Sequence, residues 1–252
     1  MATNIIAVKD IMQDLVKHAV TTGFFDKVKI TANKKGVQIE ALETNKQVIL
    51  KAHTNAPVEG WEGEFGLANL SLLQSIVNDS EYAHKDSTLE IQYQARGGSD
   101  VPSELHYTNK SKTFVAYRFV SKEMVPDQPK YNEPAWDVTV KPTKQAFQQF
   151  AWAANSLSSY EQYFIPKTVD GALRFYIGEE GGANQRGGVQ FAPDVKGDFD
   201  SNHKWQISLI SQALKLTDGA DSSVKLSSKG AIQVELDTGL VTYKFVFPAK
   251  VR

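Results

Sequence analysis

The chain repeats itself at half its own length. The segment from Phe114 to Val120 (FVAYRFV) matches the segment from Leu240 to Val246 (LVTYKFV) at an offset of 126 residues in a chain of 252. Four positions are identical, and the positive charge of Arg118 is kept at Lys244. A chain with one motif closing each half is most simply two copies of one domain.

The helical segments repeat in the same order. Apolar residues at helical spacing predict helices over residues 8–20, 67–77, 143–155 and 207–215. The first and third share a Lys-x-x-apolar-Gln-x-apolar pattern, which begins at Lys9 and at Lys144. The second and fourth share an apolar-Ser-Leu-apolar pattern from Leu70 and from Ile207. Each half therefore contributes two helices.

Strand signals fill the rest of the chain. Residues 37–41 and 89–93 alternate apolar with polar side chains, as strands with one face on a core require. Turn sequences that favour hairpins occur at Lys35-Gly36, Asn109 to Lys112, Asp170-Gly171 and Asp237-Thr238-Gly239. We predict an α+β fold in which helices pack on antiparallel sheet, with domains at 1–120 and 135–252 and a proline-bearing linker at 121–134.

Composition excludes several classes of protein. A formal charge of -1 gives no global positive field toward nucleic acid or membrane, and the absence of cysteine excludes disulfides and cysteine zinc sites. The apolar N-terminus is interrupted by Lys9, Asp10, Asp14 and Lys17, unlike a signal peptide or a membrane span. We expect a cytoplasmic protein, or one of the host cytoplasm if the chain is viral, with no membrane partner.

No motif indicates an enzyme. The sequence has no phosphate-binding loop, and its five histidines are scattered. Asp194, Asp198, Asp200 and Asn202 begin like a calcium loop, but His203 and Leu209 occupy the glycine and acid positions, so we expect a polar turn. The glycines from 178 to 188 predict a hairpin tip, and Glu179-Glu180 within it is poorly held for catalysis. We predict no catalytic residue, metal or cofactor.

Three segments resemble one family, the sliding clamps of DNA replication, which includes proliferating cell nuclear antigen and the clamps of T-even-like phages. GVQIEALE at 36–43 resembles an early strand of cellular clamps, and LSLLQSIVND at 70–79 resembles the second helix of phage clamps. The ending YKFVFPAK at 243–250 is similar to the closing strand and tail of cellular members, with Pro and Ala exchanged.

The resemblance implies a homotrimeric ring around duplex DNA, which it contacts without sequence preference. The helix residues it assigns to DNA are Lys9, Gln13, Lys17, Lys144, Gln148, Gln212 and Lys215. These faces are less basic than a DNA channel suggests, and Trp152 stands where the first helix has a lysine. The alternative is that they are ordinary solvated helix faces.

The resemblance also implies a hydrophobic pocket that takes short peptides from the polymerase and the clamp loader. The residues it assigns to this pocket are Leu42, Val125, Pro126, Phe247, Pro248 and Ala249. Because a linker with apolar residues at 124–126 gains nothing from full solvation, these residues should cover something. The alternative is that they pack the linker onto its own domains.

The function these observations predict is a bacteriophage-type sliding clamp that gives the polymerase processivity. One alternative is a β-rich phage structural or carbohydrate-binding module without a DNA role, which the strand content and aromatics such as Trp61 and Trp136 would permit. A second alternative is an enzyme of unrecognised type.

Overall fold

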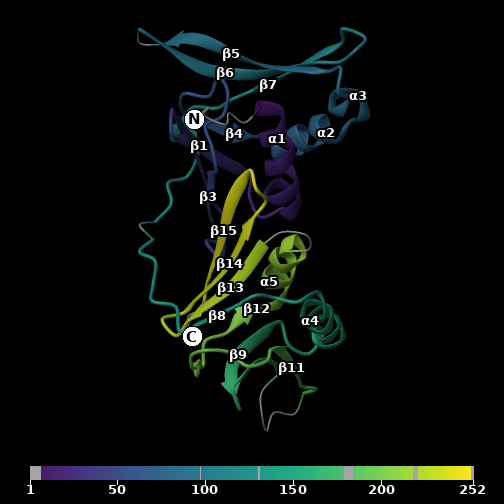
Figure 1. Cartoon of the computed structure of the whole chain (residues 1–252), viewed down its shortest axis with the longest axis vertical. Coiled ribbons are helices and arrows are strands. Elements are labelled where there is room, and N and C mark those ends of the chain that lie inside the picture. The colour runs from purple at the N-terminus through teal and green to yellow at the C-terminus, as the bar shows by residue number, and fades with distance from the viewer. Residues whose placement is uncertain (1–6, 97, 130, 179–183, 218–220, 251–252) are drawn as a thin grey trace. The chain divides into compact units, whose positions relative to one another are not determined.

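The chain divides into two compact units. The computed structural model describes residues 7–96, 98–129, 131–178, 184–217 and 221–250 (Figure 1). Unit 1 comprises Met1–Pro129 and Thr238–Tyr243, and unit 2 comprises Lys130–Asp237 and Lys244–Arg252.

Unit 1 has its helices before and within two runs of antiparallel strands. Its elements are α1 (Val8–His18), η1 (Val20–Thr22), β1 (Lys27–Asn33), β2 (Gly36–Leu42), β3 (Ile49–Thr54), β4 (Gly63–Ala68), α2 (Leu70–Asn78), α3 (Ser80–Ala83), β5 (Thr88–Arg96), β6 (Ser99–Thr108), β7 (Phe114–Arg118) and η2 (Lys122–Met124). The first run has the order β4-β1-β2-β3, and the second forms a sheet in the order β5-β6-β7.

Unit 2 follows the same plan. Its elements are β8 (Val138–Val140), α4 (Lys144–Leu157), β9 (Tyr163–Val169), β10 (Ala172–Ile177), β11 (Gly187–Ala192), β12 (Trp205–Gln206), α5 (Ile207–Leu214), η3 (Lys215–Thr217), β13 (Asp221–Ser227) and β14 (Ala231–Asp237). The last strand, β15 (Val241–Pro248), begins in unit 1 and ends in unit 2. One sheet has the order β11-β10-β9-β12, while β14-β13-β8 form the other run.

The strand orders confirm the internal duplication. The order β4-β1-β2-β3 in unit 1 corresponds to β12-β9-β10-β11 in unit 2, position by position. The two copies of the repeated motif become β7 and β15, the closing strands. The predicted α+β class, with two helices on antiparallel sheet in each domain, is correct.

The helices of unit 1 bury the residues that their periodicity selects. In α1 these are Ile11, Met12 and Leu15, and in α2 they include Leu73 and Ile76. The two helices contact each other, as Figure 1 shows. Phe65 stacks on Phe119 with ring centroids 4.3 Å apart, and the edge of Trp61 meets Phe65 at 5.4 Å. This aromatic group adds to the core of unit 1.

An aromatic cluster forms the core of unit 2. Phe150 on α4 makes edge contacts of 5.3 Å with Phe164 and Phe175, and Phe175 stacks on Phe191 at 4.3 Å. These rings fix α4 against β9, β10 and β11. Phe147, which periodicity predicts as buried, is half-buried, because Ala146 and not Phe147 lies in the middle of the stripe that α4 buries.

The helices between residues 67 and 83 differ from those predicted. The second helix starts at Leu70 instead of Leu67, because Asn69 adopts a left-handed backbone (φ 54°) that separates β4 from α2. The short helix α3 is absent from the prediction. It begins where Asp79 Oδ1 accepts a hydrogen bond from the backbone N–H of Glu81 at 2.9 Å.

The predicted hairpin turns are correct. Asp170 and Gly171 join β9 to β10 with φ of 52° and 72°, the paired left-handed residues that a two-residue hairpin needs. Asn109 accepts a hydrogen bond through Oδ1 from the Thr113 N–H at 2.9 Å, closing the β6–β7 turn. The predicted tip within 178–188 and the Glu179-Glu180 pair fall largely outside the described residues.

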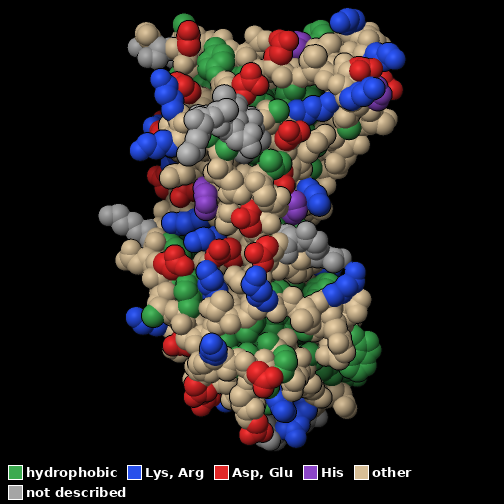
Figure 2. Space-filling view, in the orientation of Figure 1, with side chains coloured by type: hydrophobic (Ala, Val, Ile, Leu, Met, Phe, Trp, Pro, Cys, Tyr) green, Lys and Arg blue, Asp and Glu red, His purple; other side chains and the backbone are tan. Residues whose placement is uncertain are grey.

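Charges of both signs are interspersed on the surface. Figure 2 shows Lys and Arg side chains alternating with Asp and Glu over the described part of the face that it draws. No helix among the described residues is long and apolar enough to cross a membrane.

Candidate functional site

The outer faces of α4 and α5 in unit 2 carry no carboxylate. The two helices contact each other, and their sequences contain neither Asp nor Glu. Lys144, Gln148 and Gln212 are exposed on them, and Lys215, which follows α5, is exposed too. The assigned DNA residues of unit 2 therefore lie on a face of amides and two lysines, which does not repel a phosphate backbone.

Trp152 stands out on the same face of α4. Its side chain is 72% exposed, whereas Trp61 and Trp205 are almost completely buried. It lies one turn after Gln148, at the position that the repeat gives to Lys17 in α1.

In unit 1 the assigned lysines have different surroundings. Gln13 and Lys17 are exposed on α1. Lys9 is half-buried, and its Nζ donates hydrogen bonds of 2.6 Å to the backbone oxygen of His84 and to Ser87 Oγ. This lysine holds the start of α1 to the segment after α3, so it has fewer donors left for a phosphate than Lys17.

A buried polar group also ties α1 to the start of β15. The hydroxyl of Tyr243 donates to Asp14 Oδ2 at 2.7 Å, and Asp14 Oδ1 lies 3.2 Å from His18 Nδ1. Burial, followed by the Asp14 carboxylate, raises the pKa of Tyr243 well above its ordinary value of 10.0. The cluster is structural, since all three side chains face each other inside unit 1.

The linker lies on unit 1 as far as residue 129. Val125 is only 3% exposed and packs on Gly66 of β4, where a Cβ would clash with it. Gln128 donates through Nε2 to the backbone oxygens of Ala41 (2.8 Å) and Leu50 (2.6 Å). The apolar centre of the linker thus covers its own domain at Val125, while Pro126 is exposed.

Leu42 and Val125 lie at different places in unit 1. Leu42 ends β2 opposite Ile49 and is half-buried, whereas Val125 lies over β4, two strands away in the order β4-β1-β2. Sequence reasoning assigned both to one partner site, and within unit 1 they occupy separate places.

Two of the three assigned tail residues, Pro248 and Ala249, line a groove in unit 2, which we call the tail groove. Its other lining residues are Lys250, Lys229, Gly230 and Ser201 to His203, and its volume is about 530 Å³. Phe247 is buried and does not line the groove, and its backbone oxygen accepts a hydrogen bond from Trp205 Nε1 at 2.9 Å. A volume of this size suits a few side chains of a peptide.

Backbone hydrogen bonds hold the tail in place. The N–H of Ala249 donates to the oxygen of Gly230, and the N–H of Lys250 donates to the oxygen of Lys204, both at 2.9 Å. The end of β15 is therefore anchored on two sides. Pro248 is exposed at the rim and Ala249 is half-buried.

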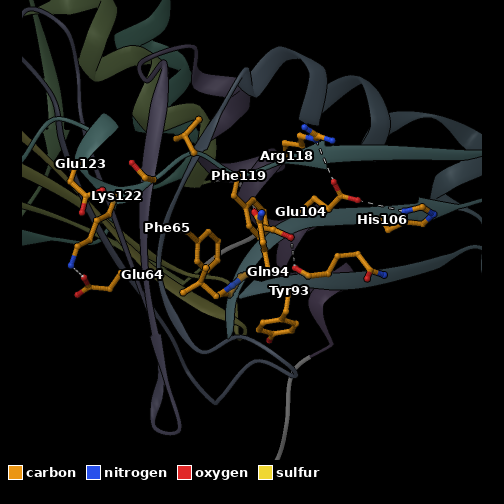
Figure 3. Close-up of a pocket in the computed structure, with 16 residues that line it drawn as sticks. Glu64, Phe65, Tyr93, Gln94, Glu104, His106, Arg118, Phe119, Lys122 and Glu123 are labelled. Carbon is orange, nitrogen blue, oxygen red and sulfur yellow. Dashed lines mark hydrogen bonds and ion pairs between the residues drawn. The ribbon is translucent and has the colours of Figure 1, made fainter. Parts of the chain in front are cut away.

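A larger groove, the hairpin groove, occurs in unit 1 and was missed from the sequence. It has a volume of about 1110 Å³ between the start of β4, the β5–β6 hairpin and the chain after β7. Figure 3 shows Phe65, Phe119 and Tyr93 among its lining residues. Its lining comes from four separate segments, so no local sequence pattern indicates it.

Ion pairs occupy much of the hairpin groove. Lys122 pairs with Glu64, and Arg118 Nε lies 3.5 Å from Glu104 Oε2 (Figure 3).

The internal duplication relates the hairpin groove to the tail groove. In unit 1 Gly66 of β4 bridges Val120 after β7, and in unit 2 Lys204 before β12 bridges Lys250 after β15. Each groove lies beside such a bridge.

The calcium-like stretch forms a turn with internal partners. Thr168 Oγ1 donates to Asp198, and Asp200 pairs with Lys167 at 3.1 Å. Within the described residues there is no group of three His, Asp or Glu side chains arranged to hold a metal ion.

Comparisons with known proteins identify the fold. No protein-family model matches the chain, and no curated protein matches it in sequence. Among solved structures, "C-terminal region of FEN-1 bound to A. fulgidus PCNA" matches with a TM-score of 0.70 at 9% identity, covering 97% of this chain and 96% of that chain. The PCNA of Thermococcus kodakaraensis matches with a TM-score of 0.66 at 14% identity, covering 96% and 97%.

Both matches extend over nearly the entire length of each chain, so they include both halves of the duplication. At identities of 9% and 14% the similarity shows the fold alone. It gives no information about the side chains on the helix faces and in the grooves. The chain has the fold of the sliding clamps.

Proposed function

We propose that the protein is a DNA sliding clamp, which encircles duplex DNA and tethers the replicative polymerase without catalysing a reaction. The observation that carries the proposal is the duplicated clamp fold over the full chain. The carboxylate-free face of α4 and α5 agrees with it. A ring retains DNA by topology, so its phosphate contacts can be few and independent of sequence.

The proposed DNA face includes Lys17 and Gln13 on α1 and Lys144, Gln148 and Gln212 on α4 and α5, with Lys215 after α5. Lys9 contributes less, because its Nζ is bonded within unit 1. The near-neutral total charge fits a ring that needs positive potential on its inner side alone.

The ring we propose is a homotrimer joined head to tail through strand edges. β7 is the last strand of β5-β6-β7, and β11 is the first strand of β11-β10-β9-β12. Unpaired edges expose backbone donors and acceptors, and pairing β7 of one subunit with β11 of the next satisfies both. The exposed Phe114 on β7, stacked on His106 at 4.8 Å, would be covered by such a contact.

The client site we propose is the tail groove of unit 2, with Pro248 and Ala249. The resemblance also assigns Leu42, Val125, Pro126 and Phe247 to client binding, and that assignment stays a prediction. The proposed clients are the DNA polymerase and the clamp loader, which bind through short peptide motifs. One of the similar structures is a C-terminal region of FEN-1 bound to A. fulgidus PCNA, which supports peptide clients as a class. The segment at 70–79 supports a phage-type clamp that acts in the host cytoplasm.

Retention on circular DNA tests the proposal. The protein is loaded onto nicked circular duplex, the complex is isolated by gel filtration, and half of it is then linearised with a restriction enzyme. A clamp stays on the circle and leaves the linear DNA by its ends. Equal retention on both forms, or none on the circle with an active loader present, contradicts the proposal.

A further inference from the structure

The tail groove is lined by basic side chains and by no acidic ones. His203, Lys229 and Lys250 are among its eight lining residues, and the other five are uncharged. Pro248, Ala249 and Gly230 supply the apolar part of the surface. A ligand that fits this lining combines an apolar group with negative charge.

The two lysines are available to a ligand. Both are exposed, and among the described residues no carboxylate pairs with either. Lys250 Nζ lies 4.3 Å above the ring centre of Tyr163, a contact that leaves its N–H groups free to turn toward an anion. The backbone N–H groups of Ala249 and Lys250 already donate within the protein, so recognition falls to side chains.

The floor of the groove is open because residue 230 is glycine. Its φ of 88° lies in the left-handed region, and a Cβ there would lie 3.4 Å from Ala249 Cβ and 3.5 Å from the His203 ring. A longer side chain would fill the space between these walls. The absence of a side chain at residue 230, in the turn from β13 to β14, therefore leaves this part of the groove open.

The positive charge of the tail groove is not shared by the equivalent groove in the other copy of the domain. Its counterpart in unit 1, the hairpin groove, is lined by Glu64, Glu104 and Glu123 and holds two lysine or arginine ion pairs. Two grooves beside equivalent strand bridges thus differ in charge, so the repeated fold does not impose the positive charge of the tail groove.

We propose that the tail groove binds an acidic peptide segment of a client protein, with Asp or Glu side chains facing Lys229 and Lys250 and a neighbouring apolar residue against Pro248 and Ala249. This inference rests on the proposed clamp function, since it names the chemistry of the client. A salt-sensitive contact of this kind speeds association and selects among clients more than it adds affinity.

Two synthetic peptides test the inference by fluorescence polarisation on the full chain. Both carry the same Leu and Phe residues and an amidated C-terminus, and they differ in having Asp or Asn at the flanking positions. We expect the Asp peptide to bind at least about fivefold more tightly at low salt, an advantage that shrinks as salt rises. Lys229→Gln with Lys250→Gln should remove that advantage, while Lys34→Gln with Lys110→Gln, a charge-matched pair in unit 1, should keep it.

Equal binding of the two peptides, no binding of either, or an advantage that survives the Lys229 and Lys250 substitutions overturns the inference. DNA retention is measured on the same variants. If the circle still retains the protein while the peptides show no charge preference, the clamp proposal stands and the acidic client does not. If the charge preference is present and the circle retains nothing, the clamp proposal fails and the acidic-peptide site stands.

Discussion

The hydroxyl of Tyr243 donates a hydrogen bond of 2.7 Å to Asp14, joining the strand that ends the chain to the helix that begins it. Tyr243 is fully buried, and the same carboxylate lies 3.2 Å from His18. Removing the hydroxyl leaves a buried carboxylate with one partner fewer, which costs more than an exposed hydrogen bond.

We therefore expect Tyr243→Phe to lower the free energy of unfolding by about 1–3 kcal/mol. Urea denaturation followed by circular dichroism measures the change. Tyr160→Phe, at an exposed tyrosine, is the control and should leave the midpoint in place. A midpoint for Tyr243→Phe equal to the wild type would show that the Asp14 contact contributes nothing to stability.

The same tyrosine predicts a loss of stability in alkali. Its pKa is raised in the folded protein, first by burial, whereas the unfolded chain ionises near the ordinary value of 10.0. The contribution of Tyr243 to the free energy of unfolding is therefore fully present below about pH 10. It is lost as the pH rises above that value, because the unfolded chain then releases the tyrosine proton while the folded protein keeps it. Burial raises the pKa of Tyr107 and Tyr117 in the same direction.

Urea midpoints measured from pH 8 to pH 11 should decline on the alkaline side, and Tyr243→Phe should show a shallower decline. It should not abolish the decline, since two other buried tyrosines remain. A variant whose slope matches that of the wild type would argue against a raised pKa at Tyr243.

Gly66 and Val125 predict how the linker is held. A Cβ on Gly66 would lie 2.7 Å from Val120 Cγ2 and closer still to Val125 Cγ2. We expect Gly66→Ala to destabilise the protein by about 1–3 kcal/mol through overpacking. Hydrogen exchange at the Val125 amide, which donates to the Lys122 oxygen at 3.1 Å, should become faster.

Adding Val125→Ala to Gly66→Ala makes room for the new methyl group and should recover part of the loss. A double-mutant cycle from urea midpoints gives the coupling between the two sites. Additive effects would mean that Val125 is not the residue that Gly66 accommodates.

The lysines assigned to DNA should differ in how much each contributes to the salt dependence of DNA binding. Lys17→Gln, Lys144→Gln and Lys215→Gln should each lower the salt dependence of binding to circular DNA by about one unit of slope. Lys9→Gln should change it less, because Lys9 Nζ is held by His84 and Ser87, and it should instead lower the melting temperature. Equal slopes for all four variants would contradict the assigned face.

Trp152 offers an intrinsic probe of the same face. It is the tryptophan with the largest exposed fraction, at 72%, so DNA passing α4 should quench or shift its emission. Trp152→Lys, which restores the residue type that α1 has at Lys17, should tighten binding by several-fold at low salt, and Trp152→Gln should not. If the tryptophan emission of the wild type is the same with and without loaded DNA, α4 does not lie next to the duplex.

The β7 edge predicts the oligomeric state. Phe119 donates its N–H inward to Ser103, so alternation along the strand turns the N–H of Ala116 outward. Ala116→Pro removes that outward donor while keeping the bonds to β6. Light scattering should give three times the chain mass of 27.9 kDa for the wild type and a monomer for Ala116→Pro, with Ala116→Ser as the control. A monomeric wild type at high micromolar concentration would contradict the trimer.

Local sequence patterns predicted the α+β class and the internal duplication of this protein, and the resemblance supplied the clamp fold. Period and turn chemistry are local properties, so the apolar stripe of Ile11, Met12 and Leu15 and the Asp170-Gly171 turn could be identified without coordinates. The match of 114–120 with 240–246 predicted the duplication, because equivalent strands of two similar domains meet the same packing demands.

Which side chains meet could be learned from the folded chain alone. Lys9 bonds to a backbone oxygen 75 residues away, Val125 covers Gly66, and Lys229 and Lys250 line a groove together. No sequence period or spacing predicts these contacts, because strand order and register determine them. The pairing of β4 with β1, and of β14 with β13, depends on the whole fold. Sequence patterns select the elements, and packing selects their neighbours.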